Sequence, residues 1–340
     1  MVPRFGHAGT IIVRSALLSV AVGVLAVEPG AVAAQELGRV REVLRRAADD
    51  ANFADAIQGL TGFAALPGIS AANFTVDEDL DGASDARMTK LVFPLAHDFQ
   101  DLRLAGGALR TELTLSYLKS KQELGNLLPG TAYAADVDTD LRIMSAIGGL
   151  GLAFDLGAHT KLRPLALAGY SHIQQDGTFS GPGAAKLEAA TDGITLNFDV
   201  DEAVFGGAIE IVHERELGHD IGFMGDVRYN YVHARTFAAS DHVLETSSHM
   251  SVLTAYAQLD GPTGLTALGR QLRWIGFVAN SSFPGSSSES LGFDYFFEFG
   301  GGIEIVDRSI VSGIDGLSLR GSALAGNGIR GWSVSAKLEF

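Results

Sequence analysis

The amino-acid sequence predicts an all-β fold, an antiparallel up-and-down barrel of about twelve strands that crosses a membrane, with an N-terminal helix expected in its lumen. Three observations support this prediction. Most of the chain after residue 69 alternates between apolar and polar side chains, the first 34 residues have the pattern of an export signal, and the last strand ends on Phe340.

Composition narrows the possible functions. The chain has 340 residues, no cysteine, 42 glycines, 46% hydrophobic residues and a formal net charge of −15. Without cysteine there is no disulfide framework and no thiolate metal site. The acidic balance argues against nucleic acid, because no basic face is available to neutralise phosphates. We therefore expect no cofactor, no metal and no nucleic-acid partner.

Residues 1–34 are interpreted as a secretory signal peptide. Arg4 and Arg14 precede an apolar run from Ala16 to Val27, and small residues follow up to a cleavage site after Ala33 or Ala34. The run is about a dozen residues long, whereas a spanning helix needs roughly 20. The mature chain is therefore expected to be exported without a helical membrane anchor.

Residues 35–60 have a helical period, since Leu37, Val40 and Leu44 recur on one face. Gly59, Gly62 and Pro67-Gly68 are expected to end this helix. Two positions remain open for it: inside the barrel lumen, against acidic wall residues, or in the periplasm as an amphipathic extension. In the lumen, the plug contacts would come from its arginines, which are Arg39, Arg41, Arg45 and Arg46.

Residues 61–340 are assigned to the barrel. In 109–119, Leu113 and Leu115 oppose Arg110 and Glu112, so each such strand has one face suited to lipid. Segment 195–214 is kept as one strand, since a turn at 199–202 would put the long loops at the wrong end. Strands are expected near 69–77, 86–96, 102–119, 138–154, 160–174, 195–214, 219–236, 249–259, 266–279, 292–306, 315–325 and 330–340.

Loop lengths orient the predicted barrel. Bacterial barrels have short periplasmic turns, long outer loops and, with an even strand number, both termini in the periplasm. Segments 77–85, 120–138, 175–190, 237–248 and 280–291 are therefore expected outside. Turns at 155–159, Leu217-Gly218 and Asp260-Gly261 are expected inside.

Charged residues opposite the lipid-facing positions should project into the lumen, because a charge in hydrocarbon costs about 2–4 kcal/mol for Arg or Lys. They would either pair with one another and fill the interior, or hold the arginines of the helix and plug the pore. This predicted luminal set is Arg110, Glu112, Glu210, Asp226, Arg228, Asp294 and Glu298.

The last ten residues alternate up to the C-terminal carboxylate, with Trp332, Val334, Leu338 and Phe340 on one face. In an outer-membrane barrel the last strand pairs with the first, and its aromatic end lies in the interfacial girdle. The bacterial outer membrane is therefore the expected location.

A helix leading into about twelve strands with a final aromatic residue resembles the autotransporter translocator domain, and more closely the solitary outer-membrane autotransporter-like β-barrels, over Gln35 to Phe340. The resemblance implies a monomeric barrel without enzymatic activity, surrounded by outer-membrane lipid and lipopolysaccharide. It also implies that the barrel-assembly machinery reads an assembly signal in the last strand, made of Trp332, Val334, Leu338 and Phe340. Because the helix begins beside the predicted cleavage site, no passenger is expected in this chain.

Two other functions remain open. One is a small diffusion channel whose helix stays in the periplasm. The other is an outer-membrane hydrolase, for which His233, Asp241, His242 and the Ser247-Ser248-His249 run provide side chains of the right kind near one predicted outer loop. His213-Glu214 does not make a zinc motif, because the second histidine would have to be at Leu217.

Overall fold

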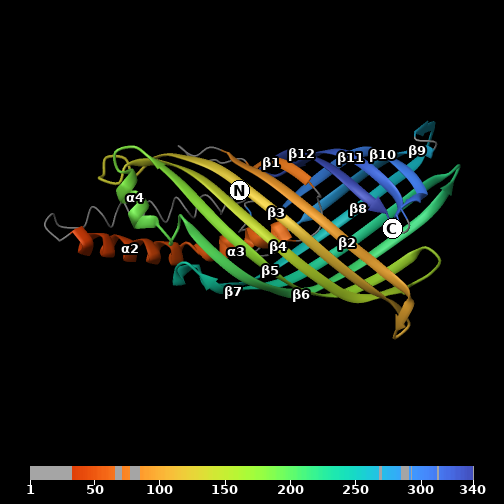
Figure 1. Cartoon of the computed structure of the whole chain (residues 1–340), viewed down its shortest axis with the longest axis horizontal. Helices are drawn as coiled ribbons and strands as arrows, with labels where there is room; N and C mark the ends of the chain where they lie inside the picture. Colours follow the sequence, from red (N-terminus) through yellow and green to blue (C-terminus); the bar gives the residue numbers. More distant parts are fainter. Residues whose placement is uncertain are drawn as a thin grey trace, which may run out of the picture.

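The computed structural model describes residues 33–65, 71–76, 85–267, 270–284, 291, 293–311 and 314–339. Twelve antiparallel strands follow one another around a closed barrel, in which β1 pairs with both β2 and β12 (Figure 1). The predicted fold class is confirmed. Of the predicted signal peptide, residues 1–32 lie outside the described residues, as does Phe340.

Every predicted strand has a counterpart in the barrel. The strands are β1 Ala71–Val76, β2 Ala86–Leu104, β3 Gly107–Leu127, β4 Ala135–Asp155, β5 Thr160–Ser180, β6 Phe198–Gly218, β7 Ile221–Ala239, β8 Ser247–Ala267, β9 Arg270–Ser282, β10 Tyr295–Val311, β11 Ile314–Gly326 and β12 Ile329–Glu339. Keeping 195–214 as a single strand is correct, because β6 runs unbroken through 199–202.

The two ends of the barrel differ in their connections. At the end that we call the short-turn end, strands are joined by residues 105–106, 156–159, 219–220, 268–269 and 312–313. The opposite end, which we call the long-loop end, has connections 77–85, 128–134, 181–197, 240–246, 283–294 and the tight 327–328. The five segments expected outside all fall at or beside connections of the long-loop end.

Several strands extend further than the sequence predicts. β8 continues through Asp260-Gly261, where a turn was expected, and reaches Ala267 after a register shift between Pro262 and Thr266. Gly261 fits there because a Cβ atom would lie 2.8 Å from the Trp274 indole nitrogen. The glycine therefore marks close packing within a strand and not a turn.

The wall has an apolar outer face and a mixed inner face. On β7, the outward Val227, Tyr229 and Tyr231 are exposed, while Arg228 and Asn230 point inward and are buried. Leu113 and Leu115 on β3 are exposed in the same way. The sequence predicted this alternation, which makes the outer surface apolar, as contact with lipid requires.

The N-terminal segment forms two helices where one was predicted. Helix α2 spans Ala33–Asp50 and α3 spans Phe53–Ala65, and they are separated by Asn52, whose φ is +53°. None of the described helices is both long and apolar enough to span a membrane. Gly62 does not end the helix, since α3 continues to Ala65. A Cβ atom at this position would overlap the side chain of Met250 on β8. The glycine lets α3 approach the wall.

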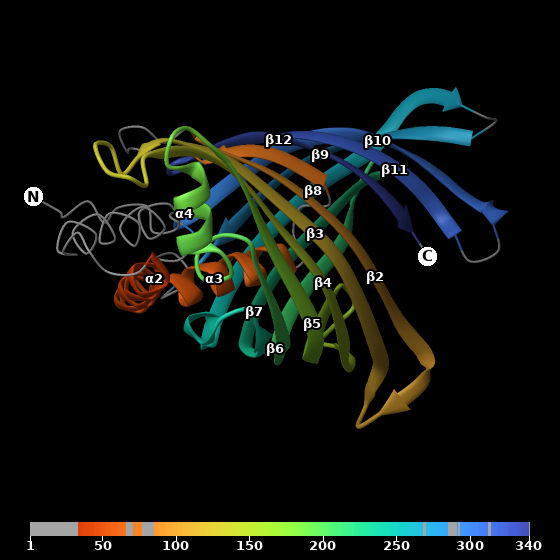
Figure 2. The ribbon, with the colours of Figure 1, turned by 60° about the vertical axis from the view of Figure 1, so that its left-hand side comes forward.

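The two helices lie in different places (Figures 1 and 2). Helix α3 lies inside the barrel, while α2 lies beyond the rim of the long-loop end, beside helix α4, Ala184–Thr191, and the short 3-10 helix η1, His242–Leu244. Sequence reasoning places both chain ends at the short-turn end. Glu339 lies there, but the first described residues are at the opposite end.

Candidate functional site

Helix α3 is enclosed on every side. Ten of its 13 residues are buried: Phe53, Ala56, Ile57, Gln58, Gly59, Thr61, Gly62, Phe63, Ala64 and Ala65. A surface helix buries one stripe only, so burial all round means that the barrel wall surrounds α3. The enclosing wall residues belong to the long-loop half of the lumen.

Aromatic packing fixes α3 in the lumen. The ring of Phe63 lies 5.5 Å from Phe74 on β1, 5.8 Å from Phe283 and 5.7 Å from Phe293, all in edge-on geometry. Edge-on pairs at such distances are favourable beyond the area that they bury. Phe53, at the other end of the helix, packs edge-on against Phe198 of β6 at 5.9 Å.

Polar contacts hold both ends of α3. Near its C-terminus the buried Lys90 of β2 donates from Nζ to the Phe63 carbonyl at 2.7 Å, and it also lies 4.5 Å from the Phe63 ring centroid. The last carbonyls of a helix lack intrahelical partners and carry partial negative charge, so a cation stabilises this end. Near the N-terminus, Thr246 donates to Asp55 at 2.6 Å.

Helix α2 is attached to the loops of the long-loop end. Arg45 donates from Nε to Asp241 at 2.9 Å and forms a second contact through Nη2 at 2.9 Å. Asp241 also accepts from the Val243 amide, so it caps η1. Arg41 donates to the Ala189 carbonyl of α4 at 2.9 Å, where the helix dipole favours a cation.

The contacts of the helix arginines therefore differ from those predicted. Arg46 pairs with Glu42 within α2 at 3.2 Å, and Arg39 is exposed. No ion pair joins any of the four arginines to the luminal carboxylates of the strands among the described residues. The reason is geometric: α2, which carries the arginines, ends before the chain enters the barrel.

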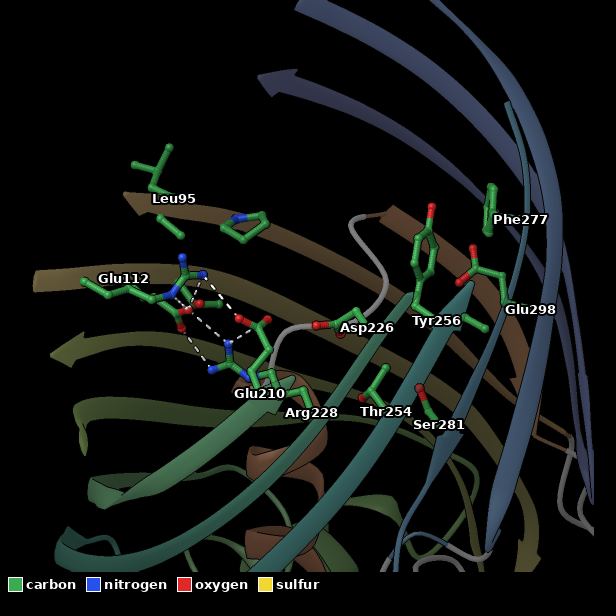
Figure 3. A pocket seen from close by; sticks show the side chains of 15 residues that line it. Leu95, Glu112, Glu210, Asp226, Arg228, Thr254, Tyr256, Phe277, Ser281 and Glu298 are labelled. Atoms are coloured by element: carbon green, nitrogen blue, oxygen red, sulfur yellow. Dashed lines mark hydrogen bonds and ion pairs between the residues drawn. The ribbon is translucent and has the colours of Figure 1, made fainter. Parts of the chain in front are cut away.

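The luminal charges pair with one another across the barrel. Arg228 of β7 contacts Glu112 of β3 at 2.9 Å, although these strands are not neighbours in the sheet (Figure 3). Glu112 also binds Arg110 at 2.7 Å. The pairs therefore join opposite walls in the short-turn half of the lumen, beyond the end of α3.

Two residues of this network were not predicted from the sequence. Arg163 of β5 bridges Glu210 and Asp98, each at 3.0 Å, and Asp98 binds Arg110 at 2.6 Å. Asp98 was missed because its strand was expected to end at residue 96. Arg163 could have been found from its inward position on a predicted strand. We call the six residues the luminal charge network: Asp98, Arg110, Glu112, Arg163, Glu210 and Arg228.

A polar chamber lies beside this network. A cavity of about 1040 Å³ reaches the short-turn end, where His159 and Glu216 line it. A second cavity of about 280 Å³ lies deeper and shares Ala96, Arg110, Glu210, Asp226 and Tyr256 with the first. Asp226 and the buried Glu298 point into the deeper cavity (Figure 3). We call these two neighbouring cavities the chamber; the larger one lies toward the short-turn end.

The remaining predicted residues are placed as follows. Asp294 is exposed and precedes β10, so it does not belong to the lumen; the chain bends there before the strand begins. Trp332 and Val334 are exposed on the outer face of β12. Leu338 is part of β12, but its side chain and Phe340 lie outside the described structure.

The side chains considered for hydrolysis are not assembled into one site. His233 and His249 stand on the outer face of the barrel with ring centroids 4.6 Å apart. Asp241 instead binds Arg45 at the rim and lies 3.1 Å from Nδ1 of the exposed His242, apart from that pair on the outer face. Within the described ranges, no group of three or more potential ligands is arranged to hold a metal ion.

Comparisons with known proteins agree with this architecture. A family model described as a solitary outer membrane autotransporter beta-barrel domain matches residues 73–336. The solved transport unit of the autotransporter AIDA-I from Escherichia coli is similar with a TM-score of 0.51 and 10% identity, over 86% of this chain and 99% of that one.

Two further solved structures are similar at lower scores. The Bordetella autotransporter BrkA β domain has a TM-score of 0.44 and 14% identity, over 78% of this chain and 94% of that one. The translocator domain of NalP from Neisseria meningitidis has a TM-score of 0.42 and 13% identity, over 79% of this chain and 86% of that one. No curated protein sequence gives a significant match.

Proposed function

Because the chain belongs to the family of solitary outer-membrane autotransporter β-barrels, we propose that it is an outer-membrane barrel whose pore is closed from within by its own helix α3. The observation that carries this proposal is the burial of α3 on every side in the long-loop half of the lumen. This burial supports closure, because the side chains that bury α3 occupy the lumen beside it.

The luminal charge network adds a second barrier. Its three arginines and three carboxylates, named above, have side chains that are only 7–14% exposed, and its pairs cross from β3 to β7. Ions entering the chamber from the short-turn end meet this bridge before they reach α3. The charges balance within the network, so it does not select strongly for either sign of ion.

Loop lengths indicate how the barrel is oriented in the outer membrane. Bacterial barrels place short turns in the periplasm, so the long-loop end would face the exterior. Helix α2 then lies outside, at the cell surface, and the chamber opens to the periplasm. Residues 1–34 would act as the export signal that precedes this arrangement.

Lipid and assembly contacts complete the proposal. The protein would be a monomer, and the exposed outer faces of its strands would contact outer-membrane lipid and lipopolysaccharide. Trp332, Val334, Leu338 and Phe340 would be read by the assembly machinery. Absence of enzymatic activity is supported by the separation of His233 and His249 from Asp241.

Single-channel conductance tests the closed pore. The intact protein is expected to conduct little, and deletion of residues 35–65 is expected to open a stable pore. The matched control deletes residues 35–50, which removes α2 and leaves α3 in place, and should stay closed. Both deletion proteins must first show the mobility difference between unboiled and boiled samples that a folded barrel gives. Equal conductance of the intact and 35–65 deletion proteins, with Arg228→Met added to both so that the luminal charge network does not hide the result, would rule out the plug.

A further inference from the structure

Glu298 is a buried carboxylate of the lumen that no cation among the described residues neutralises. It lies on β10, is 8% exposed, and points into the deeper cavity (Figure 3). Its Oε1 accepts hydrogen bonds from Ser322 and, at 2.8 Å, from Ser333. Within the described ranges its Oε2 has no hydrogen-bond partner, and neither oxygen forms an ion pair. Burying a carboxylate without a counter-ion is costly, so the cavity beside Glu298 is suited to a cation.

Two hydroxyl groups lie on the strands next to Glu298. Thr254 of β8 stands directly opposite Ser281 of β9, and Ser281 lies two residues beyond Ala279, the β9 residue opposite Glu298. All three polar side chains line the deeper cavity. The buried Thr254 Oγ1 has no hydrogen-bond partner in the described part of the chain, and the Ser281 hydroxyl makes no hydrogen bond there either. With Glu298 Oε2 they provide three acceptors, which match the three N–H donors of a primary ammonium group.

Two aromatic rings form an apolar side of the same cavity. Tyr256 of β8 and Phe277 of β9 are stacked with ring centroids 5.6 Å apart (Figure 3). Phe277 fits because its neighbour on β10 is Gly300, where a Cβ atom would overlap the ring. The Tyr256 hydroxyl donates to Gln258 at 2.7 Å, which fixes the other ring. Aromatic rings attract ammonium groups and pack against the carbon atoms of an organic ligand, whereas they offer no oxygen ligand to a metal ion.

The charges around the deeper cavity also favour a cation. Its lining includes four carboxylates and two arginines, Arg110 and Arg228. Both arginines are already paired within the luminal charge network. Arg320 contacts the Tyr256 hydroxyl at 2.8 Å but is not among the residues that line the cavity. The volume of about 280 Å³ has room for a small organic molecule, and the excess of carboxylates favours one that is positively charged.

We propose that the deeper cavity binds a small organic molecule with a primary ammonium group, which enters from the short-turn side of the barrel. The ammonium would donate to Glu298, Thr254 and Ser281, and the carbon atoms of the ligand would pack against Phe277 and Tyr256. With the orientation proposed above, the ligand comes from the periplasm. The site lies below α3, so binding does not require that α3 blocks conduction.

Isothermal titration calorimetry of the full-length barrel in a non-ionic detergent tests this site, with benzylammonium as the probe. Benzyl alcohol is a matched probe without the charge, and benzyltrimethylammonium is a matched probe without N–H donors. We expect one benzylammonium bound per barrel, with about tenfold higher affinity than either matched probe, the ratio that one charged hydrogen bond supplies. This comparison uses the unaltered protein and does not depend on the folding of a variant.

Variants then locate the site, once each has shown the gel mobility of a folded barrel. Glu298→Gln should lower the affinity for benzylammonium about tenfold, because it keeps an acceptor for Ser322 and Ser333 but loses the charge. Phe277→Leu should lower this affinity about threefold, because the aromatic face is lost. Glu216→Gln is the matched control and should leave the affinity unchanged, since Glu216 lines the larger cavity and not the deeper one.

Three results would overturn the site. The first is equal affinity of the wild type for benzylammonium and either matched probe. The second is an equal loss of affinity in Glu216→Gln and Glu298→Gln, which would indicate attraction by net negative charge alone. The third is binding of Ca²⁺ and not of benzylammonium, lost in Glu298→Gln, which would make the cavity a metal site. Failure of the plug would show in conductance, whereas failure of this site would show in the titration.

Discussion

Lys90 shows how one buried side chain can hold an internal helix. It is 3% exposed, and its ammonium group binds both the carbonyl and the ring of Phe63. A buried ammonium needs such partners, because leaving it unpaired in an apolar setting is costly. Sequence reasoning missed Lys90, since the contact depends on where α3 ends, and the glycines of α3 suggested an earlier end.

Lys90→Met should loosen α3. Loss of the charged hydrogen bond leaves the Phe63 carbonyl unsatisfied, at a cost of about 1–3 kcal/mol. We expect hydrogen exchange of the amides of residues 53–65 to rise about tenfold, as measured by mass spectrometry of peptides. Lys121→Met is the control, because Lys121 has a 62% exposed side chain and lies 3.9 Å from Asp140, its one ion-pair partner in the described part of the chain. Unchanged exchange in α3 would contradict the role of Lys90.

At the scale of elements, α2 and α3 behave as separate parts. Asn52 in the left-handed region breaks the helix between them, and Asn is among the residues that tolerate this conformation. The helical period of 35–60 identified the elements but not the break. The helical period can be read from the spacing of apolar residues in the sequence. The position of the break cannot, because it depends on where the chain crosses the rim of the barrel.

The attachment of α2 is best tested by its strongest contact. Arg45→Ala and Asp241→Ala should each release α2, and the double variant should lose little more than either single variant. A coupling of about 1 kcal/mol is expected for a partly buried pair. Protease cleavage within 33–50 of the folded barrel measures the release. Arg46→Ala is the control, because Arg46 is exposed and, among the described residues, forms an ion pair with Glu42 of α2 alone.

Strand prediction succeeded for a physical reason. The alternation of apolar and polar side chains, together with the alternation of short turns and long loops, identified all twelve strands. Both patterns are strict because one face of each strand meets lipid and the other faces a polar interior. Strand ends were less predictable. Asp260-Gly261 looked like a turn, but Asp260 instead accepts a hydrogen bond from Arg273 Nε at 3.0 Å in the strand pair. Pairing with the neighbouring strand β9 therefore outweighed the local turn signal.

At the scale of the whole molecule, the luminal charge network braces opposite walls. Sequence parity predicted that Arg110, Glu112, Glu210 and Arg228 point inward. Pairing of these residues with one another was one of the two alternatives that the sequence left open, the other being contact with the helix arginines. The sequence could not decide between them, because the choice depends on barrel diameter and on α3 ending above these residues.

Arg228→Met should weaken the barrel. It leaves Glu112, whose side chain is 7% exposed, with Arg110 as its remaining cation, and breaking a buried pair costs about 3–5 kcal/mol. The temperature at which the folded gel mobility is lost should fall. Adding Glu112→Gln to Arg228→Met should recover part of the lost thermal stability, because it removes the buried negative charge of Glu112. Arg103→Met, which removes an exposed pair with Asp155, should have no effect.

The most direct test of the enclosed helix is a disulfide between α3 and the wall. The natural chain has no cysteine, and a Cβ atom at Gly62 would lie 3.1 Å from Met250 Cγ. With Gly62→Cys and Met250→Cys combined, oxidation of intact outer membranes should give a cross-linked form in most molecules. Gly38→Cys with Met250→Cys should give none, because Gly38 has no atom within 4 Å. Cross-linking of the Gly38 pair and not of the Gly62 pair would contradict the placement of α3 in the lumen.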